Sequence, residues 1–328
     1  MSGVSRRGFL AATGVGLTAT SFAMSKSPIL RPGDQVAAIG PAGRLEPDFI
    51  QALLGNLRSL GLEPVLGPNA ERRHQFFAGT DEQRASDLNE AIRNPKIRAI
   101  SCLRGGWGCA RILPLIDWSA WRADPKPVIG FSDITALLVA AMGHKVPLGF
   151  HGSQAPPPEK PLSTASFRRA LMETGPYHIF ASGGESPPLA VDRASSDPVR
   201  GRLIGGNLMV LNQLIGTGYL PSFKDKILFL EDVNEAPYRI DRMLTQMHMA
   251  GVFKGVRAVL LGQFTKCDDP DSTDVPTAME VLREQLGKLN VPIVSNIQFG
   301  HIREQLMLPV GAEVTLNTGS QPELWWHR

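Results

Sequence analysis

The sequence has few residues that could cross-link it or hold a metal. Its 328 residues include three cysteines, Cys102, Cys109 and Cys267. An odd and sparse set of thiols is not a disulfide framework, so we expect three buried, small apolar side chains. No Cys-x-x-Cys, His-Glu-x-x-His or clustered His/Asp pattern indicates a metal site. We therefore predict neither a metal nor another cofactor.

A strong net charge and a long hydrophobic run are also missing. The 34 basic and 31 acidic residues leave a formal charge of +3, which is too small to predict nucleic-acid binding. The apolar stretch that ends near Met24 is interrupted by glycines and threonines. It is too short and too polar for a stable membrane span. Nucleic acid and a membrane are therefore not expected partners.

The N-terminus nevertheless has the pattern of an export signal. Arg6 and Arg7 precede Phe9 and a short, weakly hydrophobic region, which is typical of a twin-arginine signal. Residues 21–23 form a small-x-small cleavage site. We therefore assign residues 1–26 to the signal and expect a periplasmic protein that is exported in the folded state. A basic, disordered N-terminus is the alternative.

The first half of the chain predicts an α/β domain. With 43% hydrophobic residues, the chain can form a sizeable core, and its length predicts two domains. Short apolar runs alternate with helical patterns through residues 27–155, which is typical of a doubly wound parallel sheet. The expected strands are 35–39, 62–66, 99–103 and 128–129, and the expected helices are 49–60, 81–92 and 110–116.

The composition changes after residue 155. The run Pro156-Pro157-Pro158 is stiff, and we predict a linker at residues 156–195. Residues 196–328 have shorter apolar runs between helical patterns and predict a second, mixed α+β domain. Its expected strands are 201–204, 226–230, 258–262, 292–294 and 312–316, and its expected helices are 208–214, 238–250 and 277–289.

Ser132 lies between a strand pattern and a helical pattern. Val128 and Ile129 are typical of a buried strand end, Gly130 permits a sharp turn, and residues 134–141 look helical. A serine at a strand-turn-helix corner has the geometry of a hydrolase nucleophile, although the last glycine of the G-x-S-x-G pattern is missing. The alternative is that Ser132 only caps the next helix.

A glycine-rich turn, Arg104-Gly105-Gly106-Trp107-Gly108, follows another predicted strand. Glycines let backbone N–H groups point into a pocket, where they stabilise an oxyanion or hold a phosphate. The turn lacks the Lys-Ser/Thr ending of a phosphate-binding loop and the spacing of a dinucleotide fingerprint. A tight turn without chemistry is the alternative. In a parallel sheet, this turn and Ser132 both lie at the carboxyl edge, where ligands bind.

Carboxylates and histidines in the second half complete the candidate site. Glu231 ends an apolar run, where a carboxylate could orient a histidine, and Asp232 and Glu235 compete for the same role. A solvated strand end that pairs with an arginine is the alternative. His301 lies in a glycine-flanked loop, which suits a general base, and His151 is equally well placed by its local context.

Taken together, these residues resemble the LD-carboxypeptidase family of serine peptidases, which also contains the microcin-immunity peptidases. The resemblance runs from about Gly33 to Gly311. The segments that carry it are 78–89, 104–108 with Arg111, 130–135, 205–208, 230–232 with Glu235, 237–242, 299–301 and 308–311.

The resemblance implies a Ser-Glu-His triad in the cleft between the two domains. Ser132 would be the nucleophile, His301 the general base and Glu231 the carboxylate that orients it. The oxyanion hole would use the backbone N–H groups of Gly106, to within one residue, and of Asp133. The usual reaction of the family releases D-alanine from a murein tetrapeptide, and the resemblance also suggests a homodimer.

Substrate contacts follow less directly from the resemblance. The substrate-binding candidates are Trp107, Arg104, Asn207 and Arg239, and the two arginines could recognise the free carboxylate of the peptide. Trp107 replaces the tyrosine that is usual in the family. His151 and Gly152 precede Ser153, where relatives commonly have proline, so the side-chain preference of the pocket is open.

Three functions are compatible with the sequence. The first is an exported LD-carboxypeptidase that acts on murein tetrapeptides. The second is an immunity-type serine peptidase that cleaves a peptide or acyl-nucleotide antibiotic, which an aromatic-rich loop would favour; Trp107 is the only aromatic evident beside the matched site. The third is a periplasmic peptide-binding protein without catalysis, which would have no need of a converging triad.

Overall fold

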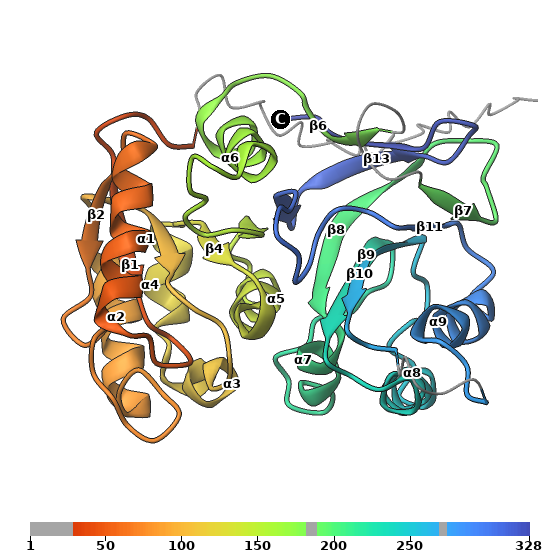
Figure 1. Ribbon diagram of the computed structural model, residues 1–328, viewed down its shortest axis with the longest axis horizontal. Coiled ribbons are helices and arrows are strands. Elements are labelled where there is room, and N and C mark those ends of the chain that lie inside the picture. The colour runs from red at the N-terminus through yellow and green to blue at the C-terminus, as the bar shows by residue number, and fades with distance from the viewer. Residues whose placement is uncertain (1–28, 182–188, 269–273) are drawn as a thin grey trace, which may run out of the picture.

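Two β-sheets, one from each half of the chain, organise the molecule (Figure 1). The computed structural model describes residues 29–181, 189–268 and 274–328. The export signal predicted at residues 1–26 lies outside these ranges. Within them, no helix is both long and apolar enough to cross a membrane.

The first sheet is the predicted parallel one. Its strands are β1 (Gln35–Ile39), β2 (Glu63–Leu66), β3 (Ile97–Cys102), β4 (Val128–Gly130), β5 (Gly149–His151) and β12 (Leu308–Val310). The order is β12-β5-β4-β3-β1-β2, in which only β12 pairs antiparallel within the described part of the sheet. The parallel order 2-1-3-4-5 is that of a doubly wound α/β fold, which confirms the predicted class. Its switch point, where ligands bind in such sheets, lies between β1 and β3.

Helices of the first half follow local sequence signals. They are α1 (Pro47–Ser59), α2 (Asp81–Arg93), α3 (Cys109–Ile112), α4 (Trp118–Ala123) and α5 (Thr135–Gly143). Pro47 begins α1 at a position where its missing N–H costs nothing, and Thr80 with Gln83 forms a capping box before α2. Helix α5 is apolar on all sides and almost entirely buried, because it lies between the two sheets (Figure 1).

The second sheet is mixed and carries its own helices. Its strands are β6 (Tyr177–Ala181), β7 (Ala190–Asp192), β8 (Val199–Asn207), β9 (Lys226–Val233), β10 (Ala258–Thr265), β11 (Ile293–Ser295), β13 (Glu313–Asn317) and β14 (Glu323–Trp326). The helices are α7 (Leu208–Gln213), α8 (Pro237–Met249) and α9 (Ala278–Gly287). The order is β6-β14-β13-β8-β9-β10-β11-β7, with β8 to β11 parallel and antiparallel strands outside them.

The segment 156–195, which we predicted as a linker, is structured in its described part. It contains α6 (Pro161–Phe167), a π-helical turn (Arg168–Met172), and the strands β6 and β7 at opposite edges of the second sheet. The chain also returns to the first sheet through β12. One continuous buried cluster of apolar side chains runs from the first sheet through α5 into the second. The two halves therefore share a core.

Candidate active site

Ser132 lies at the sharp corner between β4 and α5. Its φ angle is +62°, in the left-handed region, and residues Ser132–Ile134 form a single 3₁₀ turn. Gly130 permits the tight approach, because a Cβ atom there would lie 2.9 Å from Cγ1 of Ile134. A non-glycine residue held in this conformation is strained, and strain of this kind is typical of a nucleophile elbow.

The glycine turn lies directly against this corner. A Cβ atom on Gly105 would come within 2.8 Å of Cβ of Ser132 and 3.2 Å of the backbone nitrogen of Asp133. Gly106 has a φ angle of +100°, and the carbonyl of Gly105 accepts a hydrogen bond of 3.0 Å from the backbone N–H of Gly43. The glycine turn and the serine corner are therefore in close contact, and an oxyanion hole formed by the N–H groups of Gly106 and Asp133 stays a prediction.

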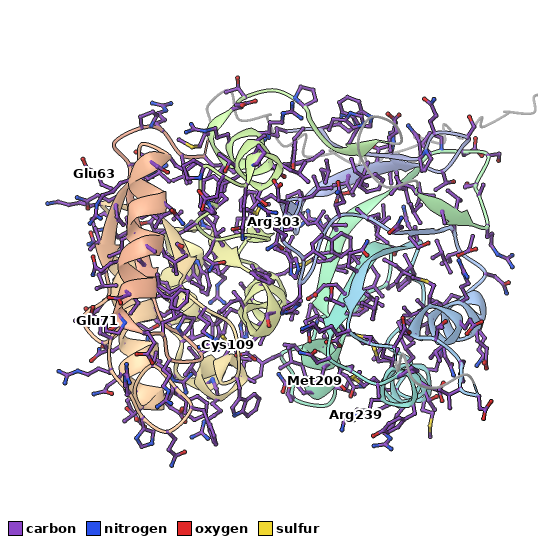
Figure 2. The ribbon with its side chains drawn as sticks, viewed as in Figure 1. Glu63, Glu71, Cys109, Met209, Arg239 and Arg303 are labelled. Carbon is purple, nitrogen blue, oxygen red and sulfur yellow. The ribbon has the colours of Figure 1, made fainter. Side chains whose placement is uncertain are left out.

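Asp133 fastens the corner to the end of the glycine turn. Its buried carboxylate accepts a 2.8 Å hydrogen bond from the backbone N–H of Cys109, the first residue of α3, which Figure 2 labels. Burial raises the pKa of Asp133 above its usual value. The side chain thus links the two loops, and a role of its backbone N–H as an oxyanion donor stays a prediction.

A buried arginine, which the sequence reading missed, supports the same turn. Arg84 donates hydrogen bonds through Nη1 to the carbonyls of Pro41 and Gly108, at 2.5 and 2.9 Å, and forms an ion pair with Asp81. Its side chain has no exposed surface. Arg84 lies within the segment 78–89 that carried the family resemblance, which was the available signal for it.

Glu231 and His301 form a close pair contributed by the second half of the chain. His301 Nδ1–H donates a 2.7 Å hydrogen bond to Oε2 of Glu231, which lies fully buried within β9. Gly300 makes room, because a Cβ atom there would lie 2.9 Å from Oε2 of Glu231. Burial alone would lower the pKa of His301, but the hydrogen bond and charge of Glu231 raise it above the usual value. This pairing leaves Nε2 of His301 as a proton acceptor.

His301 also lies beside the serine corner. The ring of Phe131, the residue before Ser132, meets the His301 ring edge-on with centroids 5.1 Å apart. Among the described residues, Ser132 and His301 share no hydrogen bond. Such contacts are often long in a free enzyme and tighten when substrate binds. Ser132, Glu231 and His301 are thus gathered at one place.

The competing carboxylates have other partners. Asp232 accepts hydrogen bonds from the amide of Asn207 at 2.8 Å and from the backbone N–H of Met209 at 3.0 Å. Burial and the charge of Glu231 raise the pKa of Asp232 to about 6. Glu235 pairs with Arg239 across 3.6 Å. Glu231 is therefore the carboxylate that contacts His301.

Asn207, a predicted substrate-binding residue, lies inside a buried polar network. Its Oδ1 caps α7 by accepting from Val210 N–H, and its backbone N–H donates to Thr135 Oγ1 at 3.0 Å. Gly206 packs on the same threonine. The network joins α5 to the end of β8 and so holds the two halves together beside the corner. A direct contact between Asn207 and substrate stays a prediction.

A cavity of about 850 Å³ opens at the switch point of the first sheet. It is lined by segments that follow β1, β2 and β3 and includes Gly106, Trp107 and Arg104. Phe49 and Phe76 also line it, with 65% and 72% of their surfaces exposed, beside Trp107 with 41%. Exposed aromatic rings gathered around a hollow are typical of a ligand site.

Two arginines differ in their relation to this cavity. Arg104 lines it and donates a 2.6 Å hydrogen bond to the carbonyl of Arg44, which also lines it. Arg239 lies on α8 in the other half of the molecule (Figure 2), where it pairs with Glu235 and the hydroxyl of Tyr238. The structure thus places Arg104, but not Arg239, on the wall of this cavity.

Cysteines and acidic clusters indicate no further chemistry in the described ranges. The three cysteines are free and buried, as predicted. No group of three or more histidine, cysteine, aspartate or glutamate side chains there is arranged to hold a metal ion.

Comparison with known proteins matches both halves of this architecture. Residues 36–152 match the LD-carboxypeptidase N-terminal domain, and residues 200–316 match the LD-carboxypeptidase C-terminal domain. The chain belongs to the LD-carboxypeptidase family. It is a serine carboxypeptidase, and hence a hydrolase.

Individual relatives agree with the family. This carboxypeptidase is 35% identical to the murein tetrapeptide carboxypeptidase of Pseudomonas aeruginosa, over 86% of this chain and 92% of that protein. The crystal structure of muramoyltetrapeptide carboxypeptidase from Oxalobacter formigenes superposes with a TM-score of 0.79 and 28% identity, over 90% and 99% of the two chains. The structure of the microcin C7 self-immunity protein MccF in complex with aspartyl sulfamoyl adenosine superposes with a TM-score of 0.80 and 25% identity. The match covers 92% of this chain and 98% of that one.

Proposed function

We propose that this carboxypeptidase removes the terminal D-alanine from murein tetrapeptides through a Ser132-Glu231-His301 triad. The observation that carries the proposal is the meeting of a strained serine with a glycine turn and a carboxylate-bound histidine. The murein tetrapeptide carboxypeptidase of P. aeruginosa supports the choice of substrate. A pure binding protein would need neither the strain nor the pairing.

The geometry supplies each step of an acyl transfer. Nε2 of His301 takes the proton of the Ser132 hydroxyl as Oγ attacks the amide carbonyl of the diamino acid. The backbone N–H groups of Gly106 and Asp133 stabilise the oxyanion, and removing one such donor typically costs about 3–4 kcal/mol of transition-state stabilisation. His301 then protonates the leaving nitrogen of D-alanine. Water hydrolyses the acyl-serine, with His301 again as the base.

Mass spectrometry of the purified chain with murein tetrapeptide tests this proposal. We expect the wild type to release D-alanine and Ser132→Ala to release none, with both proteins folded by circular dichroism. Ser86→Ala is a matched control, since Ser86 lies on the exposed face of α2. Release by both Ser132→Ala and the wild type would exclude Ser132 as the nucleophile. No release by a folded wild type would exclude the murein substrate.

A second candidate function is favoured by the cavity. We infer that an immunity-type peptidase, which cleaves an acyl-nucleotide, would use the exposed rings of Phe49, Phe76 and Trp107 to stack on a base. The sequence had shown only Trp107 near the site, and the two phenylalanines strengthen this alternative. The complex of MccF with aspartyl sulfamoyl adenosine supports it as well.

Two substrates separate these functions. Purified protein is given murein tetrapeptide and an aspartyl-adenylate analogue with a cleavable amide, at equal concentrations. A higher kcat/KM for the tetrapeptide, with Phe76→Ala close to wild type, supports the murein function. A higher kcat/KM for the nucleotide conjugate, lost in Phe76→Ala, supports the immunity function.

Export and dimerisation complete the proposal. We propose that residues 1–26 direct the folded enzyme to the periplasm, where it would trim murein peptides outside the cytoplasm. A fusion of these residues to a reporter that is active only after export tests this, with Arg6→Lys and Arg7→Lys as the variant that stays inside. The homodimer implied by the family is tested by light scattering of the purified protein.

A further inference from the structure

His151 is a fully buried histidine for which the mechanism so far has no use. It ends β5 in the first sheet, and neither ring nitrogen has a hydrogen-bond partner. Buried polar atoms are nearly always paired, so two unpartnered nitrogens on one side chain call for an explanation. The nearest charged group is Glu231, whose Oε1 lies 3.9 Å from Nε2 of His151.

Glu231 has an oxygen that lacks a hydrogen-bond donor. Its Oε2 accepts from His301, but its Oε1 is buried and has no partner. The unpartnered Oε1 of the carboxylate therefore faces the unpartnered Nε2 of the imidazole. A carboxylate in a buried site depends on hydrogen bonds to its charged form, because burial removes the water that would otherwise stabilise it.

The surroundings leave no other donor for this oxygen among the described contacts. Phe131, Phe229 and Phe299 each present a ring to His151, with centroids 6.3, 5.2 and 6.4 Å away. The titratable groups that face the pair are His301, from the loop after β11, and Asp232, from β9. Burial lowers the pKa of His151 to about 4, so the ring is neutral near pH 7 and carries a single N–H.

We propose that His151 is a positioning residue that donates its Nε2–H to Oε1 of Glu231. The carboxylate is then held between two imidazoles, with Oε2 directed at Nδ1 of His301. Reaching a normal N–H···O distance of about 2.9 Å requires the two side chains to approach by about 1 Å. Hydrogen bonds of free active sites commonly tighten in this way during catalysis. The inference rests on the proposed triad, but not on the identity of the substrate.

The proposal has a specific electrostatic consequence. Without this donor, the negative charge of Glu231 is less compensated, and it stabilises the protonated form of His301 more strongly. His301 then keeps its proton to a higher pH and is less available as a base. A residue that only filled space would leave this titration unchanged.

Labelling of Ser132 by a fluorophosphonate measures the triad without the natural substrate. Ser132 Oγ forms a bond to phosphorus, fluoride leaves, and His301 takes the hydroxyl proton. The rate of labelling is followed against pH in the full chain for the wild type, His151→Leu and His151→Gln. The leucine variant keeps an apolar volume without a donor, whereas the glutamine amide replaces the donor near the position of Nε2.

We expect His151→Leu to slow labelling roughly 10- to 100-fold, the effect of losing a hydrogen bond to a charged group. The pH below which the labelling rate falls, the acid limb of the profile, should move up by about half a unit or more in this variant. His151→Gln should recover most of the rate and the wild-type limb. Equal rates and unchanged limbs in both folded variants would overturn the proposal, as would equal impairment of both without a shift.

The labelling experiment still tests the role of His151 if one variant does not fold or if the substrate proposal is wrong. If His151→Leu does not fold, His151→Met serves as the variant without a donor and is compared with His151→Gln in the same way. If the wild type labels at Ser132 but releases no D-alanine, the murein function is wrong and the role of His151 is still decided by labelling.

Discussion

The two sheets contribute different kinds of groups to the candidate site. The first supplies backbone: a left-handed serine corner and a glycine turn packed directly against it. The second supplies charged side chains, Glu231 and His301, on or after parallel strands. Backbone donors do not titrate, but they tolerate no added atoms. Side-chain charges tolerate small changes of shape, but they depend on pH.

Removing the charge from the second sheet should have the largest effect. Glu231→Gln keeps the volume but offers His301 Nδ1–H an uncharged amide, and we expect kcat to fall roughly 10³- to 10⁴-fold. The wild type should lose kcat/KM as the pH falls through the pKa of His301, which Glu231 raises, because the base must be neutral. In Glu231→Gln this acid limb should move to lower pH.

Steady-state release of D-alanine against pH measures both effects. Glu235→Gln is the matched control, because Glu235 pairs with Arg239 rather than with His301. A kcat for Glu231→Gln within about tenfold of the wild type would contradict the assigned role.

Adding an atom to the first sheet should be nearly as damaging. Gly105→Ala places a Cβ atom 2.8 Å from Cβ of Ser132, so the glycine turn has to move away from the corner. We expect kcat to fall about 10²- to 10³-fold, as for loss of one oxyanion donor. Gly55→Ala in α1 is the control, because a Cβ atom there meets nothing within 4 Å. Equal kcat values for the two variants would mean that the turn does not serve the reaction.

His151 belongs to the first sheet but faces Glu231 of the second. It should make the free energy of unfolding depend on pH. Burial depresses its pKa to about 4, so the unfolded chain binds this proton first as the pH falls. The contribution is fully present above the unfolded value of about 6.5 and is lost toward pH 4; it amounts to about 3 kcal/mol. Urea unfolding at several pH values should show this loss in the wild type and a smaller one in His151→Gln. The same loss in both proteins would assign the acid sensitivity to other groups.

The smallest effect should come from the support of the glycine turn. Arg84 and Arg111 both pair with Asp81, but only Arg84 is buried and donates to the carbonyls of Pro41 and Gly108. We expect Arg84→Met to lower the free energy of unfolding by about 2 kcal/mol, since it removes a charged donor from two carbonyls and leaves that of Pro41 without this partner. The exposed Arg111→Ala should cost less than about 1 kcal/mol. Denaturant titration measures the free energy of unfolding of both variants. Equal losses in the two would contradict the expected effect of burial.

Local patterns in the sequence predicted much of the fold. The corner at Ser132 and the glycine turn each depend on residues within a few positions, so their shapes could be predicted locally, whereas their chemical roles came from the family resemblance. Helix α2 has its own capping box, and the predicted range 81–92 lies within one residue of the observed end. The pairing of Glu231 with His301 spans 70 residues. It was expected only because the family resemblance supplied it.

Long-range partners explain what the sequence did not predict. Phe49, Phe76 and Trp107 meet around the cavity because they follow β1, β2 and β3, which are neighbours in the sheet. Arg84 reads as a surface residue of an acidic helix, although the carbonyls of two loops hold it in the interior. The strands β6 and β7 were hidden in an assumed linker, because each is short and forms only by joining a sheet edge.

Strand β12 completes the sheet that carries Ser132 with a segment from far along the chain. Residues Leu308–Val310 cover the edge of β5 and lie in sequence just after His301. During synthesis, the sheet that carries Ser132 therefore stays open at that edge until residues 308–310 have left the ribosome. A chain truncated before Leu308 exposes the backbone of β5 to pairing with other chains. Pairing of His301 with Glu231 and protection of the sheet from aggregation thus become possible at nearly the same stage of synthesis.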